Sequence, residues 1–241
     1  MVNQKFVAKI PLIKNLFIFF AKFYILKNNF MDRYILDTNL FFNMEEGIGL
    51  GKKTEEVTKN ITLAAKQMKK QGLAEFFMPP KVVEEYLSFF ENKEQPFIKE
   101  FFSQIIIKSP DISKIQIGGD VFYQLIEDIR ERSYRGLRIG EEEIVKAAES
   151  TMGKETTNKK DFQILSGKGI KNFRERYRQA TRFGFLDSLA DLDLIMLTKE
   201  VDGFLVSTDE GVIKWGRVFG AKEMPAGVFG AKMGEHLHHQ E

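Results

Sequence analysis

The first half of the chain alternates short apolar runs with longer stretches of helical spacing. Residues 34–36 (YIL) form an apolar run that ends at Asp37, as is typical of a buried strand in a parallel sheet. Residues 54–71 place apolar side chains three and four positions apart, and Gly72 follows as the expected helix stop. A second strand is predicted at residues 74–78, and helices are predicted at 82–90 and 96–107. This order predicts a βαβ unit.

The middle of the chain departs from this alternation. Residues 121–138 and 141–152 are both helical in pattern, and no strand pattern separates them. Residues 153–169 are polar and rich in Gly, Lys and Thr, which predicts a connection, and residues 170–183 are again helical. We therefore expect residues 118–183 to form an all-helical insertion.

Strand signals return in the last part of the chain. A helix is expected at 189–200, a strand at 204–206, a short helix through Trp215 and a last extended piece near Met224. No internal repeat is visible. The whole pattern predicts a small α/β sandwich with a parallel sheet, built from residues 31–117 and 184–230 around the inserted helices. Residues 231–241 are expected to be a tail, and the histidines at 236, 238 and 239 to belong to a frayed terminus.

The first thirty residues differ from the rest. They contain the stretch LIKNLFIFFAKFYIL, in which lysines interrupt a run too short to span a bilayer. A basic start followed by an apolar run resembles a signal peptide, but no small-residue cleavage site follows it. Met31 resembles a natural protein start. We expect residues 1–30 to be a dispensable extension, with a helix on a membrane surface as the alternative.

Composition excludes several kinds of chemistry but does not identify the function. The 241 residues are 43% hydrophobic, enough for a packed core, and 36 basic against 34 acidic residues leave a net charge of +2. That charge is too small to argue for nucleic acid by itself. The absence of cysteine excludes disulfides, thiolate metal sites and cysteine nucleophiles, and it fits a reducing cytoplasm. We expect a cytoplasmic protein, with no membrane partner.

Acidic residues supply the candidate chemistry. Two of them, Asp37 and Asp209, stand just past predicted strands, where the carboxyl ends of parallel strands bring ligand-binding residues together. Asp187 and Asp191 would share a face if one helix held both, and Asp193 would point about 120° away. Glu85 lies in the helix after the second strand. The candidate set is therefore Asp37, Glu85, Asp187, Asp191, Asp193 and Asp209.

Clustered carboxylates need a compensating cation. Hard oxygen ligands select Mg²⁺ or Mn²⁺, and the natural chemistry of those ions is displacement at phosphorus. Each residue also has a simpler interpretation. Asp187 or Ser188 would cap a helix, Asp37 and Asp209 would form turns, and Glu85 would be a solvated surface residue.

The order of these motifs resembles the PIN-domain nucleases, and the details resemble the minimal protein-only ribonuclease P family, whose archaeal members have been labelled RNA ligase partner proteins. The resemblance covers residues 31–224. It rests on LDTN at 36–39, the Glu of the helix after the second strand, LDSLADLD at 186–193 and VSTDEG at 206–211, with RERSYRGLRIGEEE at 130–143 and RERYRQA at 174–180.

The resemblance implies a PIN-like three-layer α/β sandwich with a helical hairpin protrusion. It implies an endoribonuclease that hydrolyses precursor tRNA to release the 5′ leader and leave a 5′-phosphate. The family's metal-binding positions are matched by Asp37, Asp187, Asp191 and Asp209. Asp193 matches a nearby acidic position, and Glu85 matches the acid seen in many PIN domains. Residues 118–183 occupy the place of the protrusion, which in this family builds a homo-oligomer, up to a dodecamer, from dimers and helps to grip tRNA.

Basic residues of the insertion form two groups. Lys171, Arg174, Arg178 and Arg182 are spaced to line one helix face, and Arg130, Arg132, Arg135 and Arg138 form a second group. Arginine binds phosphate through its guanidinium fork, so both groups are candidate RNA-binding residues. The alternatives are a solvated face with ion pairs to Glu127, Glu131 or Glu175, and contacts between subunits.

Three functions compete at this level. The first is a magnesium-dependent precursor-tRNA endonuclease. The second is another PIN ribonuclease, such as a toxin-like enzyme, for which the long insertion fits poorly. The third is a non-catalytic RNA-binding scaffold whose acids serve as caps and turns. An aspartyl-phosphate phosphatase is disfavoured because LDTN lacks a second aspartate.

Overall fold

A computed structural model describes residues 31–42, 48–153, 158–186 and 188–237. The predictions made for residues 1–30, Asp187, His238 and His239 lie outside this range. No helix within the described part of the chain is long and apolar enough to cross a membrane.

The core of the domain is a sheet of five parallel strands in the order β3-β2-β1-β4-β5. The central strand, β1 (Asp32–Leu36), pairs with β2 (Ala74–Met78) on one side and β4 (Phe204–Val206) on the other. The outer strands are β3 (Ile105–Ile107) and β5 (Lys222–Glu223). Residues 34–36 are fully buried, as a strand covered on both faces requires. The predicted α/β fold with a parallel sheet is confirmed.

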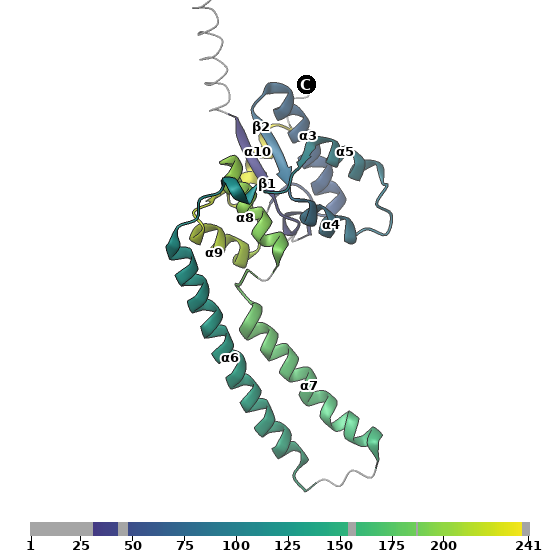
Figure 1. Ribbon diagram of the computed structural model, residues 1–241. Coiled ribbons are helices and arrows are strands. Elements are labelled where there is room, and N and C mark those ends of the chain that lie inside the picture. Colours follow the sequence, from purple (N-terminus) through teal and green to yellow (C-terminus); the bar gives the residue numbers. More distant parts are fainter. Residues whose placement is uncertain (1–30, 43–47, 154–157, 187, 238–241) are drawn as a thin grey trace, which may run out of the picture.

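Helices cover both faces of the sheet (Figure 1). One side carries α3 (Thr54–Gln71) and α5 (Pro96–Gln104), and α10 (Ala226–Glu235) packs against α3. The other side carries α8 (Leu189–Val201) and α9 (Glu210–Val218), with α4 (Pro80–Ser88) against α8. Two short elements, α2 (Asn39–Phe42) and the 3₁₀ helix η2 (Ile112–Lys114), complete the domain. As predicted, α3 ends at Gly72, whose left-handed φ of 68° closes the last turn.

The insertion is a long antiparallel hairpin that projects from the domain (Figure 1). It consists of α6 (Gly119–Thr151) and α7 (Lys159–Arg182). The prediction of two helices at 121–138 and 141–152 was wrong, because α6 runs through Gly140 without interruption. The polar connection predicted at 153–169 was also wrong for most of its length. Asn158 accepts a hydrogen bond from the Asp161 backbone N–H at 3.0 Å and starts α7 there.

Two further corrections concern the edges of the domain. Residues 105–107 were predicted to end a helix but form β3, because three successive isoleucines suit a strand that pairs alongside β2. The predicted tail, residues 231–241, begins inside α10. Met233 of that helix is fully buried in the core, so the packed domain extends beyond residue 230.

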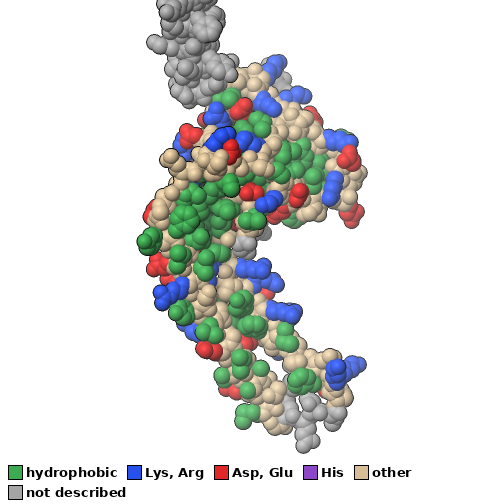
Figure 2. All heavy atoms as spheres, in the orientation of Figure 1, with side chains coloured by type: hydrophobic (Ala, Val, Ile, Leu, Met, Phe, Trp, Pro, Cys, Tyr) green, Lys and Arg blue, Asp and Glu red, His purple; other side chains and the backbone are tan. Residues whose placement is uncertain are grey.

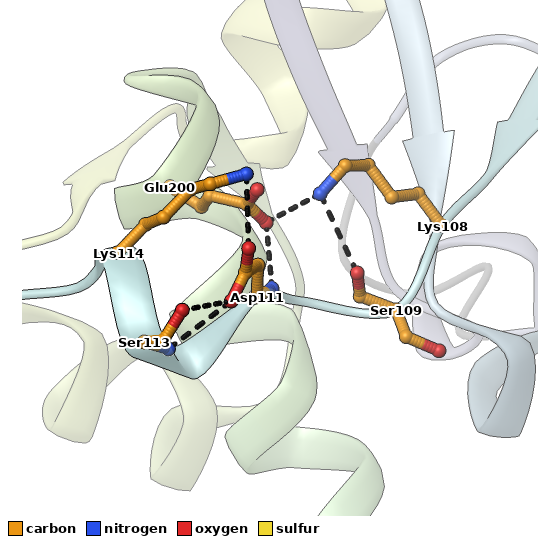
Figure 3. Close-up of polar contacts among 6 residues, drawn as sticks. All are labelled: Lys108, Ser109, Asp111, Ser113, Lys114 and Glu200. Carbon is orange, nitrogen blue, oxygen red and sulfur yellow. Dashed lines mark hydrogen bonds and ion pairs between the residues drawn. The ribbon is translucent and has the colours of Figure 1, made fainter.

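A polar cluster anchors the segment that leads from the sheet into the hairpin (Figure 3). Glu200, near the end of α8, accepts hydrogen bonds from the Lys108 ammonium and from the Asp111 backbone N–H at 2.9 Å. Burial works against the charge of Glu200, but Lys108 and the Asp111 N–H outweigh it and hold the pKa of this carboxyl below its ordinary value. Asp111 in turn caps η2 through the Ser113 N–H. The root of the hairpin is thereby tied to α8, the helix that carries Asp191 in its first turn and Asp193 just after it.

Candidate active site

Asp37 is a buried carboxylate at the carboxyl end of the central strand. Its backbone N–H continues the sheet by donating to the Val206 carbonyl at 3.0 Å, and its side chain is only 3% exposed. The Ser207 hydroxyl donates to Asp37 Oδ2 at 2.5 Å. Burial is the main reason that the pKa of Asp37 rises from 3.8 to about 7. The Ser207 hydrogen bond opposes the rise, and the charges of Asp191, Glu85 and Asp209 add to it.

Asp209 lies at the end of the neighbouring strand and caps α9. Its Oδ1 accepts the N–H groups of Gly211 at 2.7 Å and Val212 at 3.0 Å. Ser207 links the two acids, because its hydroxyl oxygen also accepts the Asp209 backbone N–H at 2.9 Å. The simpler interpretation of Asp209 was a turn, and the structure shows that it caps a helix. Asp209 still lies close enough to Asp37 to raise the pKa of Asp37. A helix cap and an active-site acid are not exclusive, since only one carboxylate oxygen makes the cap.

Asp191 comes from the first turn of α8. The Ser188 hydroxyl caps this helix by accepting the Asp191 N–H at 3.0 Å, as the capping interpretation expected. The helix begins at Leu189 and does not include Asp187, so the condition under which the two acids would share a helical face is not met. Asp187 itself lies outside the described residues. The charge of Asp191 nevertheless raises the pKa of Asp37, so the first turn of α8 borders the same site.

Glu85 and Asp193 occupy the α4 side of the site. Thr38, the residue after Asp37, donates from its hydroxyl to Glu85 Oε2 at 3.3 Å and to the Val82 carbonyl at 3.2 Å. Asp193 forms an ion pair with Lys81 of α4 at 3.3 Å and is absent from the groups that shift the pKa of Asp37. The helix geometry that predicted a different direction for Asp193 explains this separation.

Sequence reasoning missed three residues here. Ser207 bridges Asp37 and Asp209, Thr38 holds Glu85, and Lys81 holds Asp193. Ser207 and Thr38 lie inside the quoted motifs VSTDEG and LDTN, so a signal existed. Lys81 carried none, because its partner is distant in sequence.

The arrangement fits a hard divalent cation by its donor chemistry. Asp37, Glu85, Asp191 and Asp209 place negative charge at one edge of the sheet, and no lysine or arginine is among the groups that shift the pKa of Asp37. Within the described part of the chain, no three acidic groups are positioned as a ready-made metal site. Carboxylates gathered in this way repel one another, and Mg²⁺ or Mn²⁺ would neutralise their charge.

The basic residues of α7 are open to solvent. Lys171, Arg174, Arg178 and Arg182 are all exposed, and none forms an ion pair with another described residue. The alternative of pairing with Glu127, Glu131 or Glu175 is not seen among the described residues. Figure 2 shows lysine and arginine side chains along the α7 side of the hairpin, below a hollow under the domain.

Arg132 has a different role from the one expected of it. Its side chain is buried, and its guanidinium donates to Asp128 and to the carbonyls of Thr181, Phe183 and Gly184. With its donors turned inward, Arg132 ties α6 to the chain that leaves α7 and is not available to phosphate. It therefore leaves the set of candidate RNA-binding residues.

The other three arginines of this group differ among themselves. Arg130 is exposed and lies 5.7 Å from the Tyr134 ring centroid, and Arg138 is also exposed. Arg135 lines a cavity of about 750 Å³ between the base of the hairpin and α9, and its Nε has no hydrogen-bond partner among the described residues. These three stay as candidates for RNA binding.

A five-stranded parallel sheet with acids gathered at its carboxyl edge is the arrangement of a PIN-like nuclease. A family model of PINc domain ribonucleases matches residues 33–238. The chain is 34% identical to the RNA-free ribonuclease P of Methanocaldococcus jannaschii over 223 residues, which is 87% of this chain and 94% of the relative. It is 37% identical to that of Pyrococcus furiosus over 199 residues (83% and 91%) and 33% identical to that of Thermodesulfovibrio yellowstonii over 183 residues (76% and 84%). The chain belongs to the RNA-free ribonuclease P family.

Proposed function

We propose that this protein removes the 5′ leader of precursor tRNA by hydrolysing one phosphodiester bond, leaving a 5′-phosphate on the mature end. The observation that carries the proposal is the convergence of carboxylates around Asp37. The hairpin beside them exposes a row of cations on α7 that have no ion-pair partner in the described ranges. Family membership indicates which class of RNA is the substrate, since the relatives are named RNA-free ribonuclease P.

The acids would hold the metal, for which Mg²⁺ is preferred and Mn²⁺ is the alternative. Asp37, Asp191 and Asp209 would be ligands together with Asp187, and a bound cation would activate water and neutralise the leaving oxygen. Ser207 orients Asp37 and Asp209 relative to one another through its two hydrogen bonds. Thr38 holds Glu85 at the rim. Asp193 acts as a positioning residue for Lys81 instead of as a ligand.

The hairpin would bind the folded part of the tRNA. Duplex RNA is recognised mainly through its backbone and shape, which an array of arginines suits. We assign this role to Lys171, Arg174, Arg178 and Arg182 of α7, with Arg130, Arg135 and Arg138 of α6.

The hairpin would also join subunits. Its surface exposes many large apolar side chains, among them Phe122, Ile126, Leu137 and Ile144, and a mostly apolar cavity of about 560 Å³ lies between α6 and α7 near the tip. A second copy of the hairpin would cover such a surface, giving a homo-oligomer built from dimers.

Cleavage of a precursor tRNA with a mapped product tests the proposal. Purified protein with Mg²⁺ should make a single cut at the mature 5′ end, and neither Asp37→Asn nor a chelator-treated sample should cut. Asp191→Asn and Asp209→Asn should lose far more cleavage than RNA binding. A cut elsewhere would favour another PIN ribonuclease, and RNA binding without any cut would favour a scaffold. Light scattering on the same sample tests the oligomer, because a monomer mass would contradict it.

A further inference from the structure

Three exposed side chains stand in a line along α4. Lys81, Glu85 and Phe89 follow one another at intervals of four residues, and all three are exposed. Phe89 caps the helix with a right-handed helical backbone, so it continues the spiral. On an α-helix each such step rises about 6 Å and turns about 40°. We call these three residues the α4 ridge.

The α4 ridge borders the candidate active site. Its middle residue, Glu85, is held by Thr38, the neighbour of Asp37, and its charge contributes to the raised pKa of Asp37. Its first residue, Lys81, is fixed by Asp193, which lies two residues after Asp191 on α8. Lys81 is still 47% exposed in this ion pair, so its ammonium can meet a further anion.

The last residue of the ridge is an aromatic ring supported from below. Phe89 is 56% exposed, and its ring stacks on Phe42 with centroids 4.1 Å apart and planes inclined by 28°. Phe42 itself is half-buried against Tyr86 and Phe90. One face of an ordered ring is therefore packed while much of the side chain is open to solvent. Such a ring is suited to stack a nucleobase.

Sheet order separates the α4 ridge from the hairpin. α4 follows β2 and the hairpin base lies against α9, which follows β4, while β1 with Asp37 runs between the two. The acids therefore lie between a cationic hairpin and the α4 ridge. Figure 2 shows the molecule hollowed between the underside of the domain and the α7 side of the hairpin.

We propose that the α4 ridge binds the single-stranded 5′ leader, with a leader base stacked on Phe89 and a leader phosphate neutralised by Lys81. The inference rests on the proposed function, which places the folded tRNA on the hairpin. The strand that continues past the scissile phosphate then leaves on the other side of the acids. A leader is unpaired, so its bases are free to stack, whereas the bases of the duplex are not.

Two precursors that differ only in leader length test the proposal. One carries a leader of several nucleotides and the other a leader of one nucleotide. Phe89→Ala should weaken binding of the long-leader precursor about tenfold and leave the short-leader precursor unchanged. Phe89→Trp should restore binding, because any aromatic ring can stack. Lys81→Gln should weaken binding of the long-leader precursor and reduce its salt dependence by about one charge.

Leu73→Ala is the matched control. Leu73 is 42% exposed and lies just before β2, at the opposite end of the strand from α4, so its loss should change neither substrate. Thermal melts of all variants exclude unfolding as a cause. Equal losses on both precursors, or no loss on the long one, would overturn the proposal.

A leader-length RNA oligonucleotide separates this proposal from the proposed function. Its binding needs no cleavage, and Phe89→Ala should weaken it by a similar factor. Wild-type protein that fails to cut precursor tRNA but binds the oligonucleotide through Phe89 would refute only the proposed function. Normal cutting together with oligonucleotide binding that ignores Phe89 would refute only the leader site.

Discussion

Asp37 combines a charged side chain with an environment that disfavours its charge. A carboxylate with 3% exposure has lost most of its hydration, and three other acids repel it. The Ser207 hydroxyl recovers only part of that cost. A fold keeps such a residue when its charge is needed for function, so the site should be a place where stability and activity oppose one another.

Replacing Asp37 should make the metal-free protein more stable. In a chelator at pH 8, Asp37→Asn should raise the free energy of unfolding by about 1–3 kcal/mol, because the repulsion and most of the desolvation cost disappear. The folded pKa of about 7 exceeds the ordinary 3.8. The stabilising effect of the protonated carboxyl is therefore present at low pH and is lost as the pH rises through 7.

Urea titrations of both proteins at pH 8 and pH 5 check this prediction. The difference between them should shrink at pH 5, where the wild-type carboxyl is protonated. Added Mg²⁺ at pH 8 should stabilise the wild type and not Asp37→Asn. A variant less stable than the wild type at pH 8 would mean that the carboxylate is already compensated.

At the scale of elements, the hairpin depends on close packing and on one buried arginine. A Cβ added to Gly136 of α6 would lie 2.8 Å from the Tyr177 ring of α7, so a glycine lets the two helices approach. Arg132 then joins α6 to the chain just after α7 through the carbonyls of Thr181, Phe183 and Gly184. These contacts set the direction in which the hairpin leaves the domain.

Loss of the Arg132 guanidinium should therefore destabilise the fold. Arg132→Met keeps much of the side-chain volume but leaves three carbonyls and Asp128 without this donor, which should cost about 2–4 kcal/mol of unfolding free energy. Arg178→Met on the exposed face of α7 is the control and should change stability by less than about 0.5 kcal/mol. Urea titration measures both. An Arg132→Met protein with normal stability and selectively weak RNA binding would restore the phosphate-binding interpretation.

On the scale of the whole molecule, a nearly neutral chain presents its charge unevenly. The net charge is only +2, yet one face of α7 carries four exposed cations that form no ion pair with any residue the structure describes. Acids occupy the neighbouring edge of the sheet. In the proposed function, such a distribution would attract the phosphate backbone to the hairpin and would leave the scissile phosphate to the carboxylates and a bound cation.

The salt dependence of precursor-tRNA binding tests whether the α7 cations contact phosphates. The double variant Arg174→Gln and Arg178→Gln should weaken precursor-tRNA binding and lower the slope of log affinity against log salt by about 2, since two phosphate contacts are lost. Lys66→Gln with Lys70→Gln removes the same charge from α3, on the other side of the domain, and should keep the slope. Fluorescence anisotropy from low to high salt measures the slope for the wild type and for both double variants. Equal slopes for both doubles would assign the α7 cations to subunit contacts.

The sequence by itself determined the framework of the domain. A strand buried on both faces must be almost entirely apolar, so residues 34–36, 74–78 and 204–206 could be recognised, although Glu75 interrupts the second run. Asp37 and Asp209 stood out as the first acidic residues beyond two of them. Gly72 marked a helix end because its backbone conformation is one that other residues rarely adopt.

Only the tertiary structure decided those features that depend on partners distant in the chain, namely one strand, the length of α6 and the partners of two basic side chains. Isoleucines 105–107 form a strand only because β2 offers a free edge, and α6 continues through Gly140 because α7 packs along it. Arg132 has the same local sequence signature as the other arginines of its group. The carbonyls after α7 hold the Arg132 side chain inward. In the same way, Asp193 holds Lys81, and local sequence spacing reveals the partner of neither basic residue.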